Sequence, residues 1–315
     1  MKPLNIVFMG TPDFAVSTLK ILVENNCNIV GVITAPDKPA GRGRKLNESA
    51  VKQYAVSQDL KILQPTNLKD EAFLDELKAL NANLNVVVAF RMLPKVVWDM
   101  PELGTFNLHA SLLPNYRGAA PINWAIINGE TKTGVSTFFI DEEIDTGEMI
   151  QQEEIEIGAN ENAGQLHDKL MHLGSELVLK TVKELEKGPV KTTPQIENSN
   201  LKTAYKLNRD NCKIDWSASI TDIHNKIRGL SPYPAAWCVL ENGEEALDVK
   251  IYEATMEDEA HDFEIGSIQN TKKEIKVAVE NGFINIGFMK LPGKRNMAAK
   301  DLLNGYEFKT GAKML

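Results

Sequence analysis

The stretch LNIVFMGTPDFAVSTLKILVE, residues 4–24, decides the fold of this chain. Residues 4–9 are an apolar run of strand length, Gly10-Thr11-Pro12 marks a turn, and residues 12–24 have the apolar spacing of a helix. A buried strand that leads directly into a helix is typical of parallel sheets with crossover helices. We therefore expect residues 4–24 to form the first strand and helix of such a sheet.

The same alternation of strand and helix continues downstream. Further short apolar runs lie at residues 28–34, 61–63, 85–90, 107–109 and 135–140. Helical patterns follow at residues 49–57, 70–80, 121–128 and 163–187. This order predicts an α/β fold with a doubly wound, mostly parallel, Rossmann-like sheet. Ligands of such sheets bind at the carboxyl ends of the strands, near the point where the strand order reverses.

The composition and apolar pattern of the chain change after residue 189. Residues 188–208 carry two prolines and several Thr and Asn without apolar periodicity, which predicts a linker. Strand-like runs then follow at residues 212–216, 236–240, 247–254, 266–270, 275–279 and 282–289, with one helix at 220–230. Their regular spacing predicts a small OB-like β-barrel. We therefore divide the chain into a first domain, 1–189, a linker, 190–208, and a second domain, 209–315.

Length and composition restrict the class of protein. A chain of 315 residues is long enough for a full core and favours two domains. The widely spaced Cys27, Cys212 and Cys238 indicate neither a disulfide framework nor a zinc site, so we expect buried, reduced thiols. The first apolar run is too short for a signal peptide or a membrane span, which predicts a cytoplasmic protein. We also expect a monomer.

The face pattern of residues 105–109 predicts a site for chemistry. Side chains two apart on a strand share a face, so Asn107 and His109 point one way while Phe106 and Leu108 point the other. Asn is unfavourable within a strand, and burying two polar side chains together costs free energy unless something needs them. A carboxamide and an imidazole, joined by a later carboxylate, suit acyl transfer to an amine. Asp141 and Asp145 both follow in a turn, where Asp is common in any case.

The segment Asn107-Leu108-His109-Ala110-Ser111-Leu112-Leu113-Pro114, with Asp145-Thr146-Gly147 downstream, resembles the formyltetrahydrofolate-dependent formyltransferases. The resemblance implies that residues 1–189 form the catalytic domain and that formyltetrahydrofolate is the formyl donor, with no metal required. It implies three catalytic residues, namely Asn107, His109 and Asp145, because the family motif places its acid in the Asp-x-Gly pair. It also implies folate contacts from Ser111, Leu112, Leu113, Pro114, Ala89 and Phe90.

One segment departs from the family pattern. The family usually has Val-Val-Ala-Tyr-Gly before the next Leu-Pro, whereas this chain has Val88-Ala89-Phe90-Arg91-Met92-Leu93-Pro94. The segment is shorter and lacks the glycine. We therefore expect a different rim of the folate pocket, with Arg91 either near the pterin or pointing away from it.

A basic, glycine-rich loop, residues 36–45, bears on the acceptor. Composition alone favours a solvated loop, and the net charge of −8 argues against a general nucleic-acid binder, although the charges are segregated along the chain. In the family members that formylate charged initiator tRNA, a similar loop enters the acceptor arm. The resemblance therefore implies tRNA contacts from this loop and from the basic C-terminal segment, through Arg42, Arg44, Lys45, Lys294 and Arg295.

Four other interpretations remain to be compared. A dehydrogenase loses support because the loop after the first strand has only Gly10 in place of G-x-G-x-x-G. Sugar-nucleotide formyltransferases share the catalytic set, and Asn123-Trp124 is reminiscent of them, but the basic loop and second domain favour the tRNA acceptor. A glycinamide ribonucleotide formyltransferase would be a shorter single domain. A noncatalytic RNA-binding protein on a degenerate enzyme fold is disfavoured by the intact catalytic set.

Overall fold

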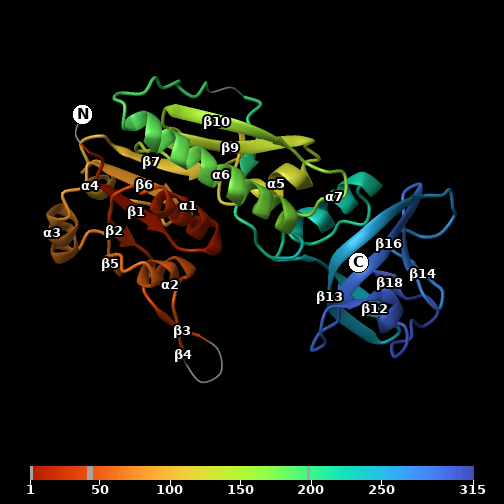
Figure 1. Ribbon diagram of the computed structural model, residues 1–315. Coiled ribbons are helices and arrows are strands. Elements are labelled where there is room, and N and C mark those ends of the chain that lie inside the picture. Colours follow the sequence, from red (N-terminus) through yellow and green to blue (C-terminus); the bar gives the residue numbers. More distant parts are fainter. Residues whose placement is uncertain (1–2, 41–44, 197–198) are drawn as a thin grey trace. The chain divides into compact units, whose positions relative to one another are not determined.

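The computed structural model describes residues 3–40, 45–196 and 199–315 (Figure 1). The chain divides into two compact units. Unit 1 comprises Met1–Gly118, Thr133–Ile155 and His167–Lys202, and unit 2 comprises Ala119–Lys132, Glu156–Leu166 and Thr203–Leu315. Each unit has its own sheet.

Unit 1 contains a seven-stranded sheet in the order β10-β9-β7-β6-β1-β2-β5. The strands are β1 Ile6–Gly10, β2 Ile29–Ile33, β5 Ile62–Leu63, β6 Leu84–Val88, β7 Thr105–His109, β9 Lys132–Phe139 and β10 Met149–Glu156. The pairs β1–β2, β1–β6, β2–β5 and β6–β7 are parallel, and β9 runs antiparallel to β7. The predicted mostly parallel sheet is confirmed. Only β10 had no predicted counterpart, because this edge strand alternates with exposed Glu and carries little apolar signal.

Helices cover both faces of this sheet, as a doubly wound fold requires. They are α1 Asp13–Glu24, α2 Ala50–Ser57, α3 Glu71–Ala79, α4 Lys95–Trp98 and α6 Ala163–Leu185. Figure 1 shows α1 and α6 together on one face, where Ser17 and Ser175 lie 3.3 Å apart between their hydroxyl oxygens. On the other face, Phe73 of α3 and Val97 of α4 pack into a cluster with Val7 of β1.

The basic loop, residues 36–45, includes strands of a short hairpin. Strands β3 Lys38–Ala40 and β4 Lys45–Asn47 pair antiparallel, where we had expected loop throughout. Arg42 and Arg44 lie outside the described residues, and Lys45 begins β4. At the base of the hairpin, Lys52 forms ion pairs with Asp37 and, at 2.9 Å, with Glu48. The hydrogen bond from Lys52 lowers the pKa of Asp37, so this anchor is charged at neutral pH.

Unit 2 contains a nearly closed antiparallel barrel, which confirms the predicted second fold. Its strands are β12 Ala236–Asn242, β13 Glu245–Asp258, β14 Ile268–Asn270, β15 Ile275–Val279, β16 Gly282–Lys290, β17 Met297–Ala298 and β18 Lys313–Met314. The sheet order is β14-β15-β16-β13-β12-β18, with β17 beside β16. Met314 also donates a backbone hydrogen bond to Gly266 at 2.8 Å, so β18 nearly joins the two ends of the sheet.

The helices of unit 2 are α5 Pro121–Ile127, α7 Ile220–Leu230 and α8 Ala299–Leu302. Helix α7 spans the predicted residues, and Ile223, Ile227 and Leu230 pack into the barrel core. Of the strand predicted at residues 212–216, only a single bridge forms, between Lys213 and Trp237. Asp215 accepts a hydrogen bond from the backbone N–H of Ser217, which turns the chain and ends the pairing. Two further two-residue strands are β8 Arg117–Gly118 and β11 Thr203–Ala204.

The three thiols are free and buried, as expected. Burial raises the pKa of Cys27, Cys212 and Cys238, that of Cys238 to about 12. A thiol must ionise to act as a nucleophile. These cysteines are therefore core residues and not reactive groups at neutral pH.

Candidate active site

The carboxyl ends of three parallel strands meet at the predicted ligand edge. Gly10 of β1 pairs with Val88 of β6, and Val88 pairs with Leu108 of β7, so His109 ends its strand beside them. The strand order reverses between β1 and β6, which is the switch point where ligands of such sheets bind. A Cβ on Gly10 would lie 2.6 Å from the Cβ of Ala15. Only glycine therefore allows this close turn from β1 into α1.

Strand β7 separates an apolar face from a polar face. Phe106 and Leu108 are buried, and a Cβ on Gly174 of α6 would lie 2.7 Å from the Leu108 side chain, so this face packs closely on α6. Asn107 and His109 point to the opposite face. Asn107 is half-buried, and its carboxamide has no hydrogen-bond partner in the part of the chain that the structure describes. An amide with free donors and acceptor beside His109 suits the binding of a substrate oxygen.

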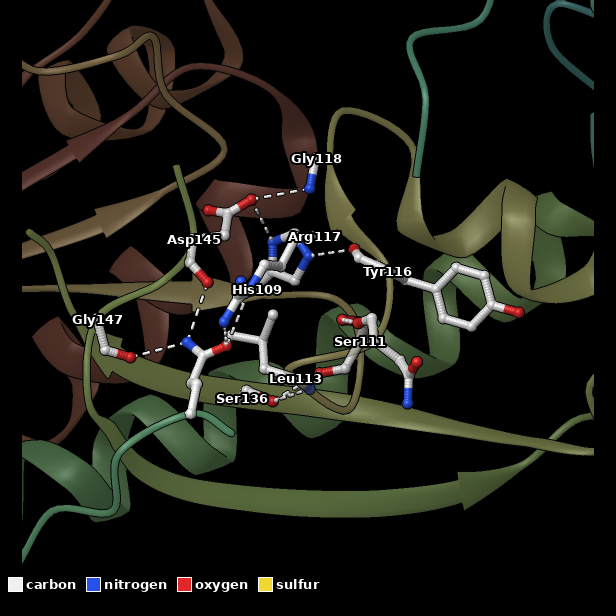
Figure 2. Close-up of polar contacts among 11 residues, drawn as sticks. His109, Ser111, Leu113, Tyr116, Arg117, Gly118, Ser136, Asp145 and Gly147 are labelled. Carbon is white, nitrogen blue, oxygen red and sulfur yellow. Dashed lines mark hydrogen bonds and ion pairs between the residues drawn. The ribbon is translucent and has the colours of Figure 1, made fainter. Parts of the chain in front are cut away.

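His109 is held between a backbone carbonyl and a carboxylate (Figure 2). Its side chain is 7% exposed, and its Nε2 lies 2.8 Å from the carbonyl oxygen of Tyr116. A carbonyl only accepts hydrogen bonds, so Nε2 carries the proton in this arrangement. Nδ1 lies 3.7 Å from Oδ2 of Asp145, which is ion-pair distance and longer than a hydrogen bond. The site thus fixes both the tautomer and the plane of the imidazole.

The two candidate carboxylates have different surroundings. Oδ2 of Asp145 accepts a hydrogen bond from the backbone N–H of Gly118 at 2.9 Å, which holds it beside His109. Asp141 is exposed, and its Oδ1 accepts hydrogen bonds from the Glu143 N–H and the Thr146 hydroxyl at 3.1 and 2.8 Å. Asp141 therefore closes its own turn. The carboxylate that can act on the imidazole is that of Asp145.

The third position of the Asp-Thr-Gly triplet requires glycine for a steric reason. A Cβ on Gly147 would lie 1.7 Å from the carbonyl oxygen of Phe139. No side chain fits there unless the backbone moves. Since Gly147 follows Asp145 by two residues, its close approach to β9 sets the position of the carboxylate.

Gly147→Ala is therefore expected to displace this loop. We expect a loss of about 1–3 kcal/mol in the free energy of unfolding, the usual cost of overpacking, and reduced turnover because Asp145 moves. Denaturant unfolding and steady-state kinetics check this. Gly305→Ala is the control, because a Cβ there meets nothing within 4 Å. Wild-type stability and turnover in Gly147→Ala would contradict the steric argument.

The segment after His109 is a tightly bonded loop. The hydroxyl of Ser111 donates to the Asn115 carbonyl at 2.7 Å, and Ser136 of β9 donates to the Ser111 carbonyl at 2.6 Å. Gln152 of β10 donates to the Leu113 carbonyl at 2.8 Å. Ser111 and Leu113 are buried, whereas Leu112 and Pro114 are half-buried. The loop predicted to bind folate therefore has a fixed shape, and the Ser111 hydroxyl serves that shape.

The unusual segment after β6 is bonded to a neighbouring segment of the same unit through Arg91. Ala89 is exposed and Phe90 half-buried. The guanidinium of Arg91 donates to the carbonyls of Pro65 and, at 3.1 Å, Thr66, and lies 5.5 Å from the centre of the Phe90 ring. Desolvation lowers the pKa of Arg91. Arg91 thus ties the segment after β6 to the segment after β5.

Three non-glycine residues around the site have left-handed backbones. These are Ala89 with φ 47°, Tyr116 with φ 60° and Asp145 with φ 58°. Such conformations cost free energy and persist where surrounding contacts impose them, often at functional sites. Tyr116 and Asp145 contact His109 directly, and Ala89 follows Val88, which pairs with Leu108. The sequence carries no signal for them.

Sequence reasoning also missed a side-chain link between two loops. Arg117 donates from Nε and Nη2 to Oε1 of Gln195 at 3.0 and 2.9 Å. Nε2 of Gln195 donates to the carbonyls of Asp145 and Gly147 at 3.0 and 2.7 Å. Arg117 had no explanation from the sequence, and Gln195 lies in the predicted linker. A glutamine in a polar stretch gives no signal of such a role.

The predicted tRNA contacts lie in both units. Lys45 begins β4 in unit 1, while Lys294 and Arg295 are exposed in the turn between β16 and β17 of unit 2.

Among the described residues, no group of three or more His, Cys, Asp or Glu side chains could hold a metal ion. No helix in the described ranges is long and apolar enough to cross a membrane.

Comparisons with known proteins give a consistent family. The formyl transferase profile matches residues 4–182, and the formyl transferase C-terminal domain profile matches residues 206–307. A methionyl-tRNA formyltransferase of Flavobacterium johnsoniae is 64% identical over 100% of both chains, and one of Bacteroides fragilis is 54% identical over 99% of this chain and 98% of its own. A crystal structure of an N-formyltransferase from Helicobacter canadensis, in complex with folinic acid and dTDP-3-aminofucose, covers 90% of this chain and 98% of its own, with TM-score 0.66 and 22% identity.

Proposed function

We propose, because this chain belongs to the formyl transferase family, that it transfers a formyl group from formyltetrahydrofolate to the α-amine of methionyl initiator tRNA. The observation that supports charged tRNA as the acceptor substrate is the 64% identity, over the whole of both chains, to a methionyl-tRNA formyltransferase. Likeness at that level extends through both units. The product would be formylmethionyl-tRNA for translation initiation.

The reaction requires three functions of the protein. The amine attacks the formyl carbon as the free base, and a tetrahedral intermediate forms whose oxygen carries negative charge. The new bond joins carbon to the amine nitrogen, and the bond from carbon to the folate nitrogen breaks. The amine loses a proton and the folate nitrogen gains one. The protein must therefore stabilise the oxyanion, move a proton and hold both substrates.

In this proposal, Asn107 and His109 stabilise the oxyanion and move the proton. The unpartnered carboxamide of Asn107 donates to the oxyanion. The Nε2 N–H of His109 exchanges its hydrogen bond to the Tyr116 carbonyl for one to the substrate oxygen, and its proton then passes to the folate nitrogen. The ring takes up the proton that the amine loses, so the number of protons is conserved. Catalytic hydrogen bonds often form only once substrate is bound. Asp145, 3.7 Å from Nδ1, stabilises the positive charge of the protonated ring.

The folate donor belongs beside the strand ends. Ala89 and Phe90 follow β6, and the loop formed by Ser111, Leu112, Leu113 and Pro114 follows His109, so both segments flank the proposed reacting atoms. The folinic acid bound by the Helicobacter canadensis enzyme, which has this fold, supports a folate ligand. Arg91 donates hydrogen bonds to the carbonyls of Pro65 and Thr66, and we propose that it points away from the pterin.

Sugar-nucleotide formyl transfer is the second candidate. The Helicobacter canadensis enzyme was crystallised with an amino-sugar nucleotide, and it spans nearly the whole of this chain, so the fold alone does not select the acceptor. Its 22% identity is far below that of the methionyl-tRNA enzymes. We further propose that the protein acts as a monomer in the cytoplasm.

Donor consumption tests the proposed function. We expect the protein to convert formyltetrahydrofolate to tetrahydrofolate when charged initiator tRNA is present, with one folate consumed per amine formylated. Uncharged tRNA should give no turnover, because it has no α-amine. Consumption that does not depend on charged tRNA would contradict the proposal.

Arg42→Ala is expected to weaken transfer to charged tRNA by about 1–3 kcal/mol, the cost of a lost specific contact to nucleic acid. Folate binding should hardly change. If Arg42 contacts a phosphate, the apparent tRNA affinity should fall less steeply with salt in the variant, because fewer counterions are released. Rates measured with tRNA at several salt concentrations check this. Lys20→Ala, an exposed charge on α1, is the control. Full tRNA activity in Arg42→Ala would favour the sugar acceptor.

A further inference from the structure

Gln195 joins the two loops that hold His109. It lies between the two matched ranges, 4–182 and 206–307, and is half-buried in unit 1. Its Oε1 accepts two hydrogen bonds from Arg117, and its Nε2 donates one each to the carbonyls of Asp145 and Gly147. An amide offers two donor hydrogens and an acceptor oxygen with two lone pairs. Every hydrogen-bonding position of this carboxamide is therefore used.

Both loops contribute a partner of the imidazole. The first loop supplies the Tyr116 carbonyl to Nε2 of His109, and its Gly118 N–H fixes the Asp145 carboxylate. The second loop carries Asp145 itself. Gln195 bonds to Arg117, which lies between Tyr116 and Gly118, and to the main chain of Asp145. Gln195 therefore influences the positions of both partners of His109.

The Asp145 loop needs such a link. Residues 141–144 are exposed, so packing holds the loop only from its Gly147 end, and Asp145 adopts a left-handed backbone that costs free energy without support. Gln195 itself is anchored, because Thr193 and Met149 exchange backbone hydrogen bonds at 2.9 Å in both directions. The segment that carries Gln195 is thus fixed to the start of β10, immediately after the loop that Gln195 bonds.

We infer that Gln195 is a positioning residue for formyl transfer, which holds the carboxylate of Asp145 at its distance from His109 by bonding the Asp145–Gly147 main chain to Arg117. This inference rests on the proposed function and extends it to a residue outside the catalytic set. Gln195 touches no reacting atom and acts through Asp145. A small error in the placement of a catalytic group costs about a hundredfold in rate.

Gln195→Met tests the inference, because methionine is similar in length and forms none of the four hydrogen bonds. We expect kcat to fall about ten- to a hundredfold, while the KM values for folate and charged tRNA stay within about threefold. Gln195→Glu keeps the acceptor for Arg117 but turns an anionic oxygen toward two carbonyls, and we expect a fall in kcat there too. Gln58→Met, on an exposed glutamine, should leave kinetics unchanged.

The decisive arm repeats both substitutions in an Asp145→Asn background. If Gln195 acts through the carboxylate, its loss should cost at most about two- to threefold more there, because interacting residues are not additive. Equal costs in both backgrounds, a loss confined to KM, or no loss would overturn the inference. If Gln195→Met does not fold, Gln195→Glu supplies the comparison. A wild-type protein without formyl transfer would instead overturn the proposed function.

Discussion

His109→Ala is expected to lower turnover by about two to four orders of magnitude, the range for losing acid–base or oxyanion assistance. Folate affinity should stay nearly intact, because the imidazole is buried between Tyr116 and Asp145 and offers the folate little contact area. Single-turnover rates and equilibrium folate binding check the two parts separately. His172→Ala, on the exposed side of α6, is the matched control. A small loss of rate with a large loss of folate affinity would make His109 a binding residue.

Asp145→Asn is expected to give the second-largest loss. The amide can still accept the Gly118 N–H, so the loop should keep its place. It cannot stabilise the charge on the ring. Two unit charges about 4 Å apart interact by roughly 4 kcal/mol at an effective dielectric constant of about 20, so the loss could reach about a thousandfold.

The matched variant for Asp145 is Asp141→Asn, which removes the same charge four residues earlier. Asp141 is exposed and only closes its own turn, so the effect on turnover should be much smaller. The unfolding midpoint of each variant shows whether a rate loss comes from misfolding. If the two substitutions exchange their effects, the acid of this site is Asp141.

The fold was predictable where burial leaves an apolar pattern. Strand β6, Leu84–Val88, is buried at every position, and the sequence shows it as an apolar run that only Asn85 interrupts. Strand β10 was not predicted, because the exposed face of an edge strand needs no apolar residues. Residues 212–216 form only one bridge of the predicted strand. Their apolar side chains are buried in the barrel core, but the hydrogen bond between Asp215 and Ser217 turns the backbone after it. Burial alone therefore does not distinguish a strand from a packed turn.

The candidate site was predictable only for side chains that interrupt a pattern. Asn107 and His109 stand out because polar residues on a central strand are costly. Asp145 needed the family motif, since Asp141 is equally plausible in a turn. The Tyr116 carbonyl and the Gly118 N–H belong to the backbone, which every residue has. Their position depends on the loop conformation, which the sequence pattern does not encode locally.

The most direct measurement supplies formyltetrahydrofolate together with charged initiator tRNA, free methionine and a 4-amino sugar nucleotide in one reaction, and identifies by mass spectrometry which amine carries the new formyl group. We expect formylation of the α-amine of tRNA-bound methionine, with the other two amines unchanged. Formylation of the sugar amine, with tRNA-bound methionine unmodified, would contradict the account.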